Sequence, residues 1–239
     1  MKKKTWVVSA ALVAVGLLGL GGTSARAQET SKFDFSADYS YIAHNLTNSY
    51  CGDYGDFVEC EDPGLQGFKL AGAVNLNSHV GIQCDVSYHA GNHTVYGYAY
   101  PEDEEQYTGR EADDITTFTC GPKLTERVGN FELFGTLGAG GMHAYQNFLE
   151  YEAEGEDPNN YGETAKGTIF GLEVGGGVDW VRKHWGIRLL EVDYVHGTGT
   201  LNGRCEIDCS DGGYAFTGVA KANDLQIAMG VNFRFGSTK

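Results

Sequence analysis

The stretch of sequence that decides the fold is LQIAMGVNFRF, residues 225–235 of this 239-residue chain. Apolar and aromatic side chains occupy every second position, and small or polar ones lie between them. The first set is Leu225, Ile227, Met229, Val231, Phe233 and Phe235, and the second includes Gln226, Asn232 and Arg234. Only a β-strand sends successive side chains to opposite faces. Residues 225–235 therefore predict a strand with one apolar face and one polar face.

Seven more segments have the same period of two, at residues 33–41, 68–76, 80–88, 117–124, 131–140, 170–180 and 185–196. The last of these is irregular. Strict alternation through Leu190, Val192 and Tyr194 places Arg188 on its apolar face. Two explanations are open: Arg188 extends its charged end to a membrane interface, or a β-bulge near Leu189 reverses the alternation.

The connections between the segments alternate in length. Those at residues 45–65, 90–112, 146–164 and 197–222 are long, polar and acidic, whereas those at 77–79, 125–130 and 181–184 are short. In an antiparallel meander this alternation places all the long loops at one end. Eight strands of about 9–12 residues suit a closed barrel, which has no exposed strand edges. We therefore expect an all-β fold, an eight-stranded antiparallel up-and-down barrel.

The size of the side chains indicates which face looks inward. The interior of an eight-stranded barrel is just wide enough to be filled by side chains. The apolar faces carry Phe, Tyr, Trp, Leu, Ile and Val, which would overfill it, whereas the polar faces are rich in Gly, Ala, Ser and Thr. Aromatic residues also gather near the segment ends, as in the girdles of membrane barrels. These features favour a transmembrane barrel with a polar lumen over a soluble barrel with an apolar interior.

The charge of the chain excludes nucleic-acid binding, and its first residues predict export. The net charge is −15, from 17 basic and 32 acidic residues, so the basic surface that nucleic acid requires is missing. Residues 1–27 have the pattern of a signal peptide, with three lysines, an apolar stretch and the cleavage sequence Ala25-Arg26-Ala27. Cleavage would leave residues 28–239 as the barrel domain. It removes four basic residues and no acidic one, which brings the net charge to −19.

On these segments and the final strand, the chain resembles the small outer-membrane β-barrel family, of the kind of the OmpA transmembrane domain and OmpX, and the group called outer membrane protein beta-barrel domain. The resemblance covers nearly all of residues 33–235. It implies insertion into the outer membrane, contact with its lipid and lipopolysaccharide, and an assembly signal at Gly230, Phe233 and Phe235 for the outer-membrane assembly machinery. The chain departs from the family pattern at Ala228, where a polar residue is usual, and in the four residues after Phe235. Functions vary widely on such a fold, so the resemblance implies little about function.

Six cysteines in an exported chain favour disulfide bonds. Cys51 and Cys60 lie in the first long connection, and Cys205 and Cys209 lie in the fourth, so we expect one bond within each pair. A crossed bond, such as Cys51 with Cys205, is the alternative.

Cys84 and Cys120 lie on adjacent predicted strands, and their register can be tested. If the two are opposite one another, every further pair also joins residues of one face: Val80 with Leu124, Ile82 with Pro122, and Val86 with Phe118. We therefore expect a third disulfide here, with two free thiols facing lipid as the alternative.

The polar faces carry charged residues that a barrel would enclose. They are Asp34, Asp38, Lys69, Asp85, Lys123, Glu132, Glu173, Asp179, Glu191, Asp193 and Arg234. Charges in a narrow lumen must pair with one another or meet water. We expect a salt-bridge network that fills the lumen, and the alternative is a narrow pathway for ions or solutes.

The expected role is structural, adhesive or recognition at the cell surface, through four acidic loops that include residues 102–105, 154–157 and 208–211. The loops would bind an extracellular ligand or protein. A narrow channel is the second hypothesis. A lipid hydrolase or acyltransferase is the third, with His196 as the best-placed residue, although no serine nucleophile adjoins it. The sequence has no zinc or dinucleotide motif, so we expect no cofactor and no enzyme.

Overall fold

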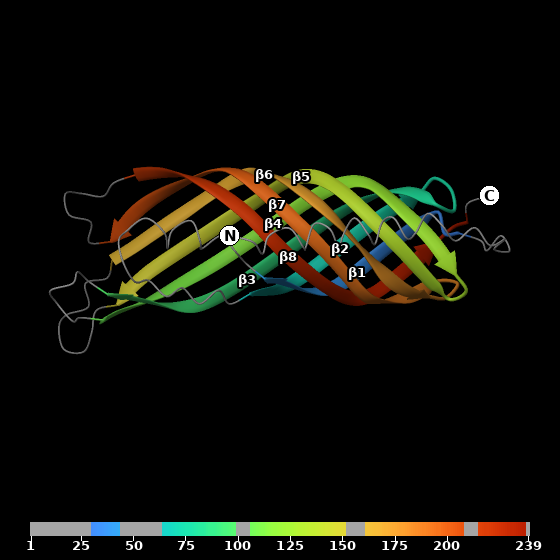
Figure 1. The fold of residues 1–239 in the computed structure, drawn as a ribbon, viewed down its shortest axis with the longest axis horizontal. Helices are drawn as coiled ribbons and strands as arrows, with labels where there is room; N and C mark the ends of the chain where they lie inside the picture. Colours follow the sequence, from blue (N-terminus) through green and yellow to red (C-terminus); the bar gives the residue numbers. More distant parts are fainter. Residues whose placement is uncertain (1–29, 44–63, 99–105, 152–160, 208–214, 238–239) are drawn as a thin grey trace, which may run out of the picture.

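The computed structural model describes residues 30–43, 64–98, 106–151, 161–207 and 215–237. Within them, eight antiparallel strands form one closed barrel, in which neighbours in sequence pair and the last strand closes on the first (Figure 1). The strands are β1 (Phe33–Ala43), β2 (Leu65–Asn75), β3 (Val80–Tyr98), β4 (Gln106–Val128), β5 (Phe131–Tyr151), β6 (Tyr161–Val181), β7 (Trp185–Ile207) and β8 (Ala215–Phe235). The predicted up-and-down barrel is confirmed. None of the described residues belongs to a helix long and apolar enough to cross a membrane.

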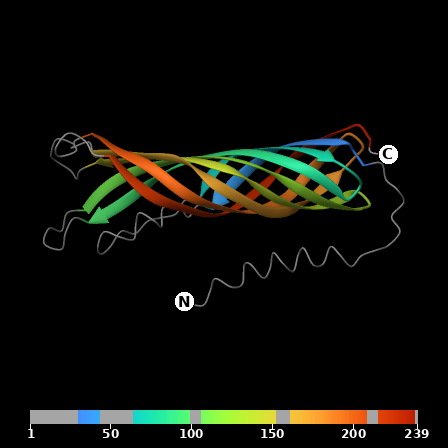
Figure 2. The ribbon, with the colours of Figure 1, turned by 90° about the horizontal axis from the view of Figure 1, so that it is seen from above.

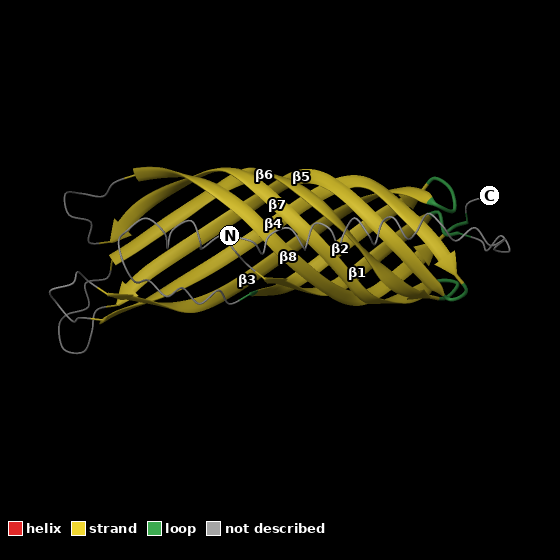
Figure 3. Cartoon of the chain, in the orientation of Figure 1, coloured by secondary structure: helices red, strands yellow, loops and turns green. Residues whose placement is uncertain are grey.

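The short turns lie together at one end of the barrel, as the sequence predicts. Figure 3 shows them in green, at the same end as the C-terminus. They join β2 to β3, β4 to β5 and β6 to β7. In transmembrane barrels the short turns face the periplasm. We therefore call this the periplasmic end and the opposite one the loop end.

The register of the strands agrees with the pairing predicted from the cysteines. Cys84 is opposite Cys120 and the two form a disulfide. The barrel closes between β1 and β8, which pair from Phe33 with Phe235 to Ala43 with Leu225. The other two predicted disulfides lie outside the described residues: residues 51, 60 and 209 are not described, and for residue 205 only the backbone pairing is.

The irregular segment contains a β-bulge, the second of the two explanations. Opposite β6, the register of β7 steps from Asp179 with Arg188 to Val178 with Leu190, so Leu189 is the extra residue. Leu189 and Leu190 are both exposed on the outside, while Arg188 is only 3% exposed. The bulge therefore turns Arg188 into the lumen.

Six strands are longer than predicted, so the connections expected at residues 90–112, 146–164 and 197–222 are at the predicted end but shorter than predicted. β1 and β2 have 11 residues each, whereas β3 to β8 have 19 to 23. β3 and β4, for example, pair without a break from Val80–Leu124 to Tyr98–Gln106. Most residues expected in loops therefore belong to strands that continue past the ends of β1 and β2 (Figure 2).

The extra strand length escaped the sequence pattern because the two faces exchange polarity partway along the long strands. Toward the loop end of β6, the outward positions change from Leu172 and Phe170 to Lys166, while the inward positions change from Glu173 to Ile169. The period of two continues, but its phase reverses. The segments predicted from a constant alternation therefore end where the polar and apolar faces exchange.

The outward apolar side chains form a band around the periplasmic part of the barrel. A tilted strand needs about 9–11 residues to cross a membrane, so the 11-residue β1 and β2 match one crossing. At the edge of the band nearest the loop end, the Tyr88 hydroxyl donates to Asp114 (3.0 Å) and the Tyr194 hydroxyl donates to Asn223 (2.8 Å). Such side chains, apolar in the ring and polar at the tip, are typical of a membrane interface. β3 to β8 therefore extend beyond the membrane at the loop end.

Val174 tests the lipid-facing surface. It points outward in the middle of the apolar part of β6, where we expect Val174→Arg to destabilise the folded barrel by about 2–4 kcal/mol. Thr168→Arg lies three outward positions nearer the loop end of the same strand, beyond the band, and should change stability by less than about 0.5 kcal/mol. Urea titration of the protein refolded in lipid vesicles measures both. Equal costs for the two variants would contradict the position of the band.

Candidate functional site in the barrel lumen

The structure places the eleven charged residues predicted for the lumen on inward-facing positions. Ten of them are buried and Asp34 is half-buried. Their side chains gather around three cations at successive heights, Arg234 near the periplasmic end, then Arg188, then Lys69. Arg188 is not one of the eleven, because strict alternation had placed it on the outer face.

Lys69 of β2 is the centre of the group nearest the loop end. Its Nζ donates to Glu173 Oε1 and Asp193 Oδ2, both at 2.8 Å, and to Glu191 Oε1 at 3.3 Å. Asp85 of β3 lies 3.9 Å from the same nitrogen. The lysine side chain is 1% exposed. One cation therefore ties β2 to β6 and β7 across the full width of the lumen.

Arg188 of β7 is the centre of the next group. Its Nη1 donates to Asp38 Oδ2 at 2.9 Å and to Glu191 Oε2 at 2.7 Å, and its Nε donates to Asp179 Oδ1 at 3.1 Å. Glu191 thus accepts hydrogen bonds from both Lys69 and Arg188. This shared carboxylate joins the two groups into one network.

Phe134 is an aromatic residue in the lumen that the sequence reading missed. It is 3% exposed, and its ring lies 4.6 Å from the guanidinium carbon of Arg188 and 5.1 Å from Nζ of Lys123. Two cations flanking one aromatic ring are stabilised by its negative faces. Phe134 is two residues after Glu132 on β5, so a strand that turns Glu132 inward also turns Phe134 inward.

Arg234 of β8 holds the network at the periplasmic end. Its Nη2 donates to Glu132 Oε2 at 2.7 Å and its Nε donates to Asp34 Oδ1 at 3.3 Å. Asn75 Nδ2 also donates to Asp34, at 2.7 Å, and the Ser31 hydroxyl donates to the same carboxylate. β1, β2, β5 and β8 are therefore linked at their periplasmic ends.

Glycines on the inner faces make room for these carboxylates. A Cβ atom on Gly175 would lie 2.7 Å from Cγ of Asp193, and one on Gly230 would lie 2.6 Å from Cα of Asp38. Both distances are shorter than real carbon contacts allow. The Gly230 of the proposed assembly signal thus also has a packing role, while Phe233 and Phe235 point outward and are 44% and 57% exposed.

Between the charged groups and the loop end, the side chains in the lumen are first polar and uncharged, and then apolar. His89 Nε2 and Gln226 Nε2 each lie 2.8 Å from the Ser40 hydroxyl. Beyond them an apolar cluster fills the barrel: Ile42, Leu65, Ile115, Met142, Ala144, Ile169, Val195, Leu201 and Ala222. Eight of these nine lie outside the segments predicted from the alternation, because the polarity exchange ends the pattern before them; Val195 alone lies inside one, on the face of Asp193.

The charged part of the lumen encloses a small cavity. The cavity bounded by Arg188, Lys123 and Arg234 has a volume of about 10 Å³, which is room for about one water molecule. The predicted charged residues, with Arg188 added, comprise eight carboxylates and four cations, so the network is acidic on balance.

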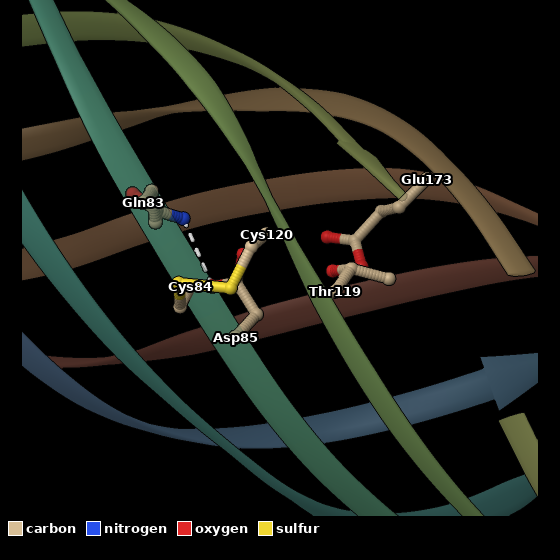
Figure 4. Close-up of a disulfide and its surroundings, with 6 residues drawn as sticks. All are labelled: Gln83, Cys84, Asp85, Thr119, Cys120 and Glu173. Carbon is tan, nitrogen blue, oxygen red and sulfur yellow. Dashed lines mark hydrogen bonds between the residues drawn. A yellow bond between two sulfur atoms is a disulfide. The ribbon is translucent and has the colours of Figure 1, made fainter. Parts of the chain in front are cut away.

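The disulfide lies on the outside of the same wall. Cys84 and Cys120 point outward, whereas their neighbours Asp85 and Thr119 point into the lumen (Figure 4). Thr119 Oγ1 donates to Glu173 Oε2 at 2.8 Å, and Gln83 Nε2 donates to Asp85 Oδ1 at 2.9 Å. The bond between β3 and β4 therefore fixes the pair of strands that bring Asp85 and Thr119 into the network.

Comparison with known proteins identifies the fold. No protein-family model and no curated protein sequence matches the chain. Solved structures that resemble it include the outer membrane protein OprG from Pseudomonas aeruginosa, with 11% identity over 88% of this chain and 98% of that one, at a TM-score of 0.51. The outer membrane protease OmpT from Escherichia coli has 10% identity over 89% and 100%, at 0.49. Ail, the attachment invasion locus protein of Yersinia pestis, has 15% identity over 86% and 98%, at 0.38.

The chain has the fold of the outer-membrane β-barrels. An apolar exterior around a polar interior is what a barrel needs in lipid, and both are present in β1 to β8. The fold and this outer surface together make the protein an outer-membrane barrel.

Lys69 provides a test of the network. Lys69→Met removes the cation and leaves Glu173, Asp193 and Glu191 buried beside one another, so we expect a loss of about 3–5 kcal/mol in the free energy of unfolding. Adding Glu173→Gln to this variant should restore part of the loss. Lys166→Met, at an outward and exposed position, is the control and should cost less than about 0.5 kcal/mol. Guanidinium unfolding in detergent micelles measures all three, and a Lys69 variant as stable as the control would argue against the network.

Proposed function

We propose that the protein is a closed scaffold that holds acidic loops at the cell surface for a structural, adhesive or recognition role. The closed lumen is the observation that carries this proposal. An ion crossing the barrel would have to pass the groups around Arg234, Arg188 and Lys69 and then the apolar cluster. Each group spans the lumen with hydrogen bonds of 2.7–3.3 Å. Breaking a buried ion pair by removing one partner costs about 3–5 kcal/mol.

The length of β3 to β8 supports a role at the surface. These strands have 19 to 23 residues, about twice the 9–11 that a crossing needs. Most of their outer positions beyond the apolar band are polar, for example Lys166, Thr198 and Asn202. A wall that continues into water and has an apolar core of its own is a rigid mount for loops. Residues 102–105, 154–157 and 208–211 supply the acidic charge of those loops.

The acidic balance of the lumen favours a second candidate, a narrow cation pathway. With eight carboxylates to four cations, an opened lumen would attract cations rather than anions. This candidate requires the apolar cluster and the network to rearrange. For the enzyme hypothesis, the residue singled out from sequence, His196, lies on the outer face with Nδ1 3.0 Å from Oδ1 of Asn223, and we propose no reaction there.

Conductance separates the two candidates. Refolded protein in planar bilayers should give no ion steps at voltages where a porin in the same bilayer conducts, because the described residues place buried ion pairs and then an apolar cluster across the lumen. Faster migration of unheated than boiled protein on a detergent gel shows that the barrel is folded. Reproducible, cation-selective steps from folded protein would overturn the scaffold proposal in favour of the channel.

Charge neutralisation tests the loops. Replacing Glu102, Asp103, Glu104 and Glu105 by their amides should leave the heat-dependent gel migration unchanged, because these residues lie outside the described strands. It should lower the attachment of cells expressing the protein to the level of a deletion strain. Lys166→Gln, at an outward position on β6, is the control and should leave attachment as in the wild type. Attachment that is the same in the deletion strain and the wild type would argue against an adhesive role.

A further inference from the structure

The periplasmic end carries an open, basic depression that the proposed function does not use. It has a volume of about 920 Å³ and is bordered by the end of β4, the β6–β7 turn and the end of β8. Arg127, Arg182, Lys183 and Arg234 line it, together with His184. Among the described residues, its lining includes no Asp or Glu. Because Arg234 is already paired with Glu132 and Asp34, the charge offered to the depression comes mainly from Arg182, Lys183 and Arg127, and it favours an anionic ligand.

The backbone holds these residues on a fixed platform. The amide of Arg182 donates to the carbonyl of Trp185 at 2.8 Å, which closes the β6–β7 turn. The amide of Val181 donates to the carbonyl of Asn130 at 2.7 Å, and the amide of Arg234 donates to the carbonyl of His184 at 3.0 Å. The turn is thus anchored on both sides, and a ligand would pay little to order it.

Tryptophans connect the depression to the lipid-facing surface. The guanidinium carbon of Arg182 lies 4.6 Å from the ring centre of Trp180, and the rings of Trp180 and Trp185 meet edge to face at 5.5 Å. Trp185 is 46% exposed on the outside of the barrel. Tryptophan is enriched at the height of lipid head groups, where one part of its ring system meets hydrocarbon and the other meets water. The depression therefore opens at head-group height.

Two arginines have hydrogen-bonding capacity that the described protein atoms leave unused. Arg234 is 3% exposed, and its Nη1 has no hydrogen-bond partner among the described residues, although Nε and Nη2 are paired. The Nε of Arg127 has none either. A buried N–H without an acceptor is costly. Both nitrogens are enclosed, so a phosphate in the depression would reach them through a bridging water, whereas the exposed Arg182 offers its guanidinium group directly.

We propose that this depression binds the phosphate head group of an anionic phospholipid of the periplasmic leaflet. The phosphate lies over the exposed side chains of Arg182 and Lys183, and the acyl chains run along the outer surface beside Trp185. The lipid-facing tryptophan favours a lipid over a soluble anion, which would gain nothing from an apolar rim. The site anchors the periplasmic end of the barrel, whatever the acidic loops bind at the other end.

Native mass spectrometry of the folded protein in an uncharged detergent tests this assignment. Phosphatidylglycerol should bind about tenfold more tightly than phosphatidylcholine with the same acyl chains, since each basic residue near a lipid surface adds attraction. Arg182→Gln with Lys183→Gln should reduce the ratio to less than about twofold. Both residues are exposed in a turn that is held by backbone bonds, so the variant should fold. Lys166→Gln with Lys221→Gln removes the same charge from exposed positions nearer the loop end and should keep the ratio.

Four results would overturn the proposal. Equal binding of the two lipids by the wild type would show that the site has no selectivity for an anionic head group. An equal loss of lipid preference in both double variants would show that the preference comes from the net charge of the protein and not from this site. Millimolar inorganic phosphate that saturates the site, without any lipid preference, assigns it to a soluble anion. Co-sedimentation with peptidoglycan that depends on Arg182 and Lys183, again without lipid preference, assigns it to the cell-wall glycan. Faster migration of each unheated variant on a detergent gel confirms that every comparison uses folded protein.

Discussion

The interior of an eight-stranded barrel has room for side chains and little else, so each charge that faces inward must find its partner there. Glu191 meets this constraint twice, by accepting from Lys69 at 3.3 Å and from Arg188 at 2.7 Å. Arg188 and Glu191 are three residues apart, and strict alternation would send them to opposite faces. The bulge at Leu189 brings both inside. One extra residue in β7 thus makes the network continuous, and removing it would turn Arg188 toward lipid.

The polarity of the filling follows the medium outside the wall. Where the exterior meets lipid, the apolar side chains are on the outside and the ion pairs are within. Where the exterior meets water, most outer positions are polar, with Val219 as an exception, and the inner cluster of Ile42, Ile115 and Met142 is apolar. The sequence posed a membrane barrel with a polar lumen and a soluble barrel with an apolar interior as alternatives. The strands contain both arrangements, the first at the periplasmic end and the second toward the loop end. In each part the apolar side chains are kept from water, by lipid in the first and by the barrel wall in the second.

The sequence was sufficient for the features that depend on a constant alternation, and insufficient where that alternation changes. The eight strands, the inward position of Lys69 and the register of Cys84 with Cys120 all follow from a period of two. The apolar cluster did not, because its residues keep the period and reverse its phase. The partners of Lys69 could not be found either, since alternation gives the face of a residue but not its height across the barrel. The parity rule does place Phe134 inside, on the same face of β5 as Glu132, although most of its neighbours on that face are small.

The height of a residue is the property that the disulfide controls. Slipping β3 against β4 by one residue would expose charges to lipid, so polarity alone prevents it. Slipping by two residues would keep every side chain on its proper face, but it would shift Asp85 relative to Lys69 and Thr119 relative to Glu173. The Cys84–Cys120 bond excludes that second slip. Its two cysteines are 36 residues apart, and the loop-entropy model assigns such a closure between about 3 and 4.7 kcal/mol. Among the described residues β3 pairs only with β4 beyond Ala90, just as β8 pairs only with β7 before Leu225. Over that length the register of the β3–β4 hairpin has no second neighbouring strand to support it, and the covalent bond supplies this support.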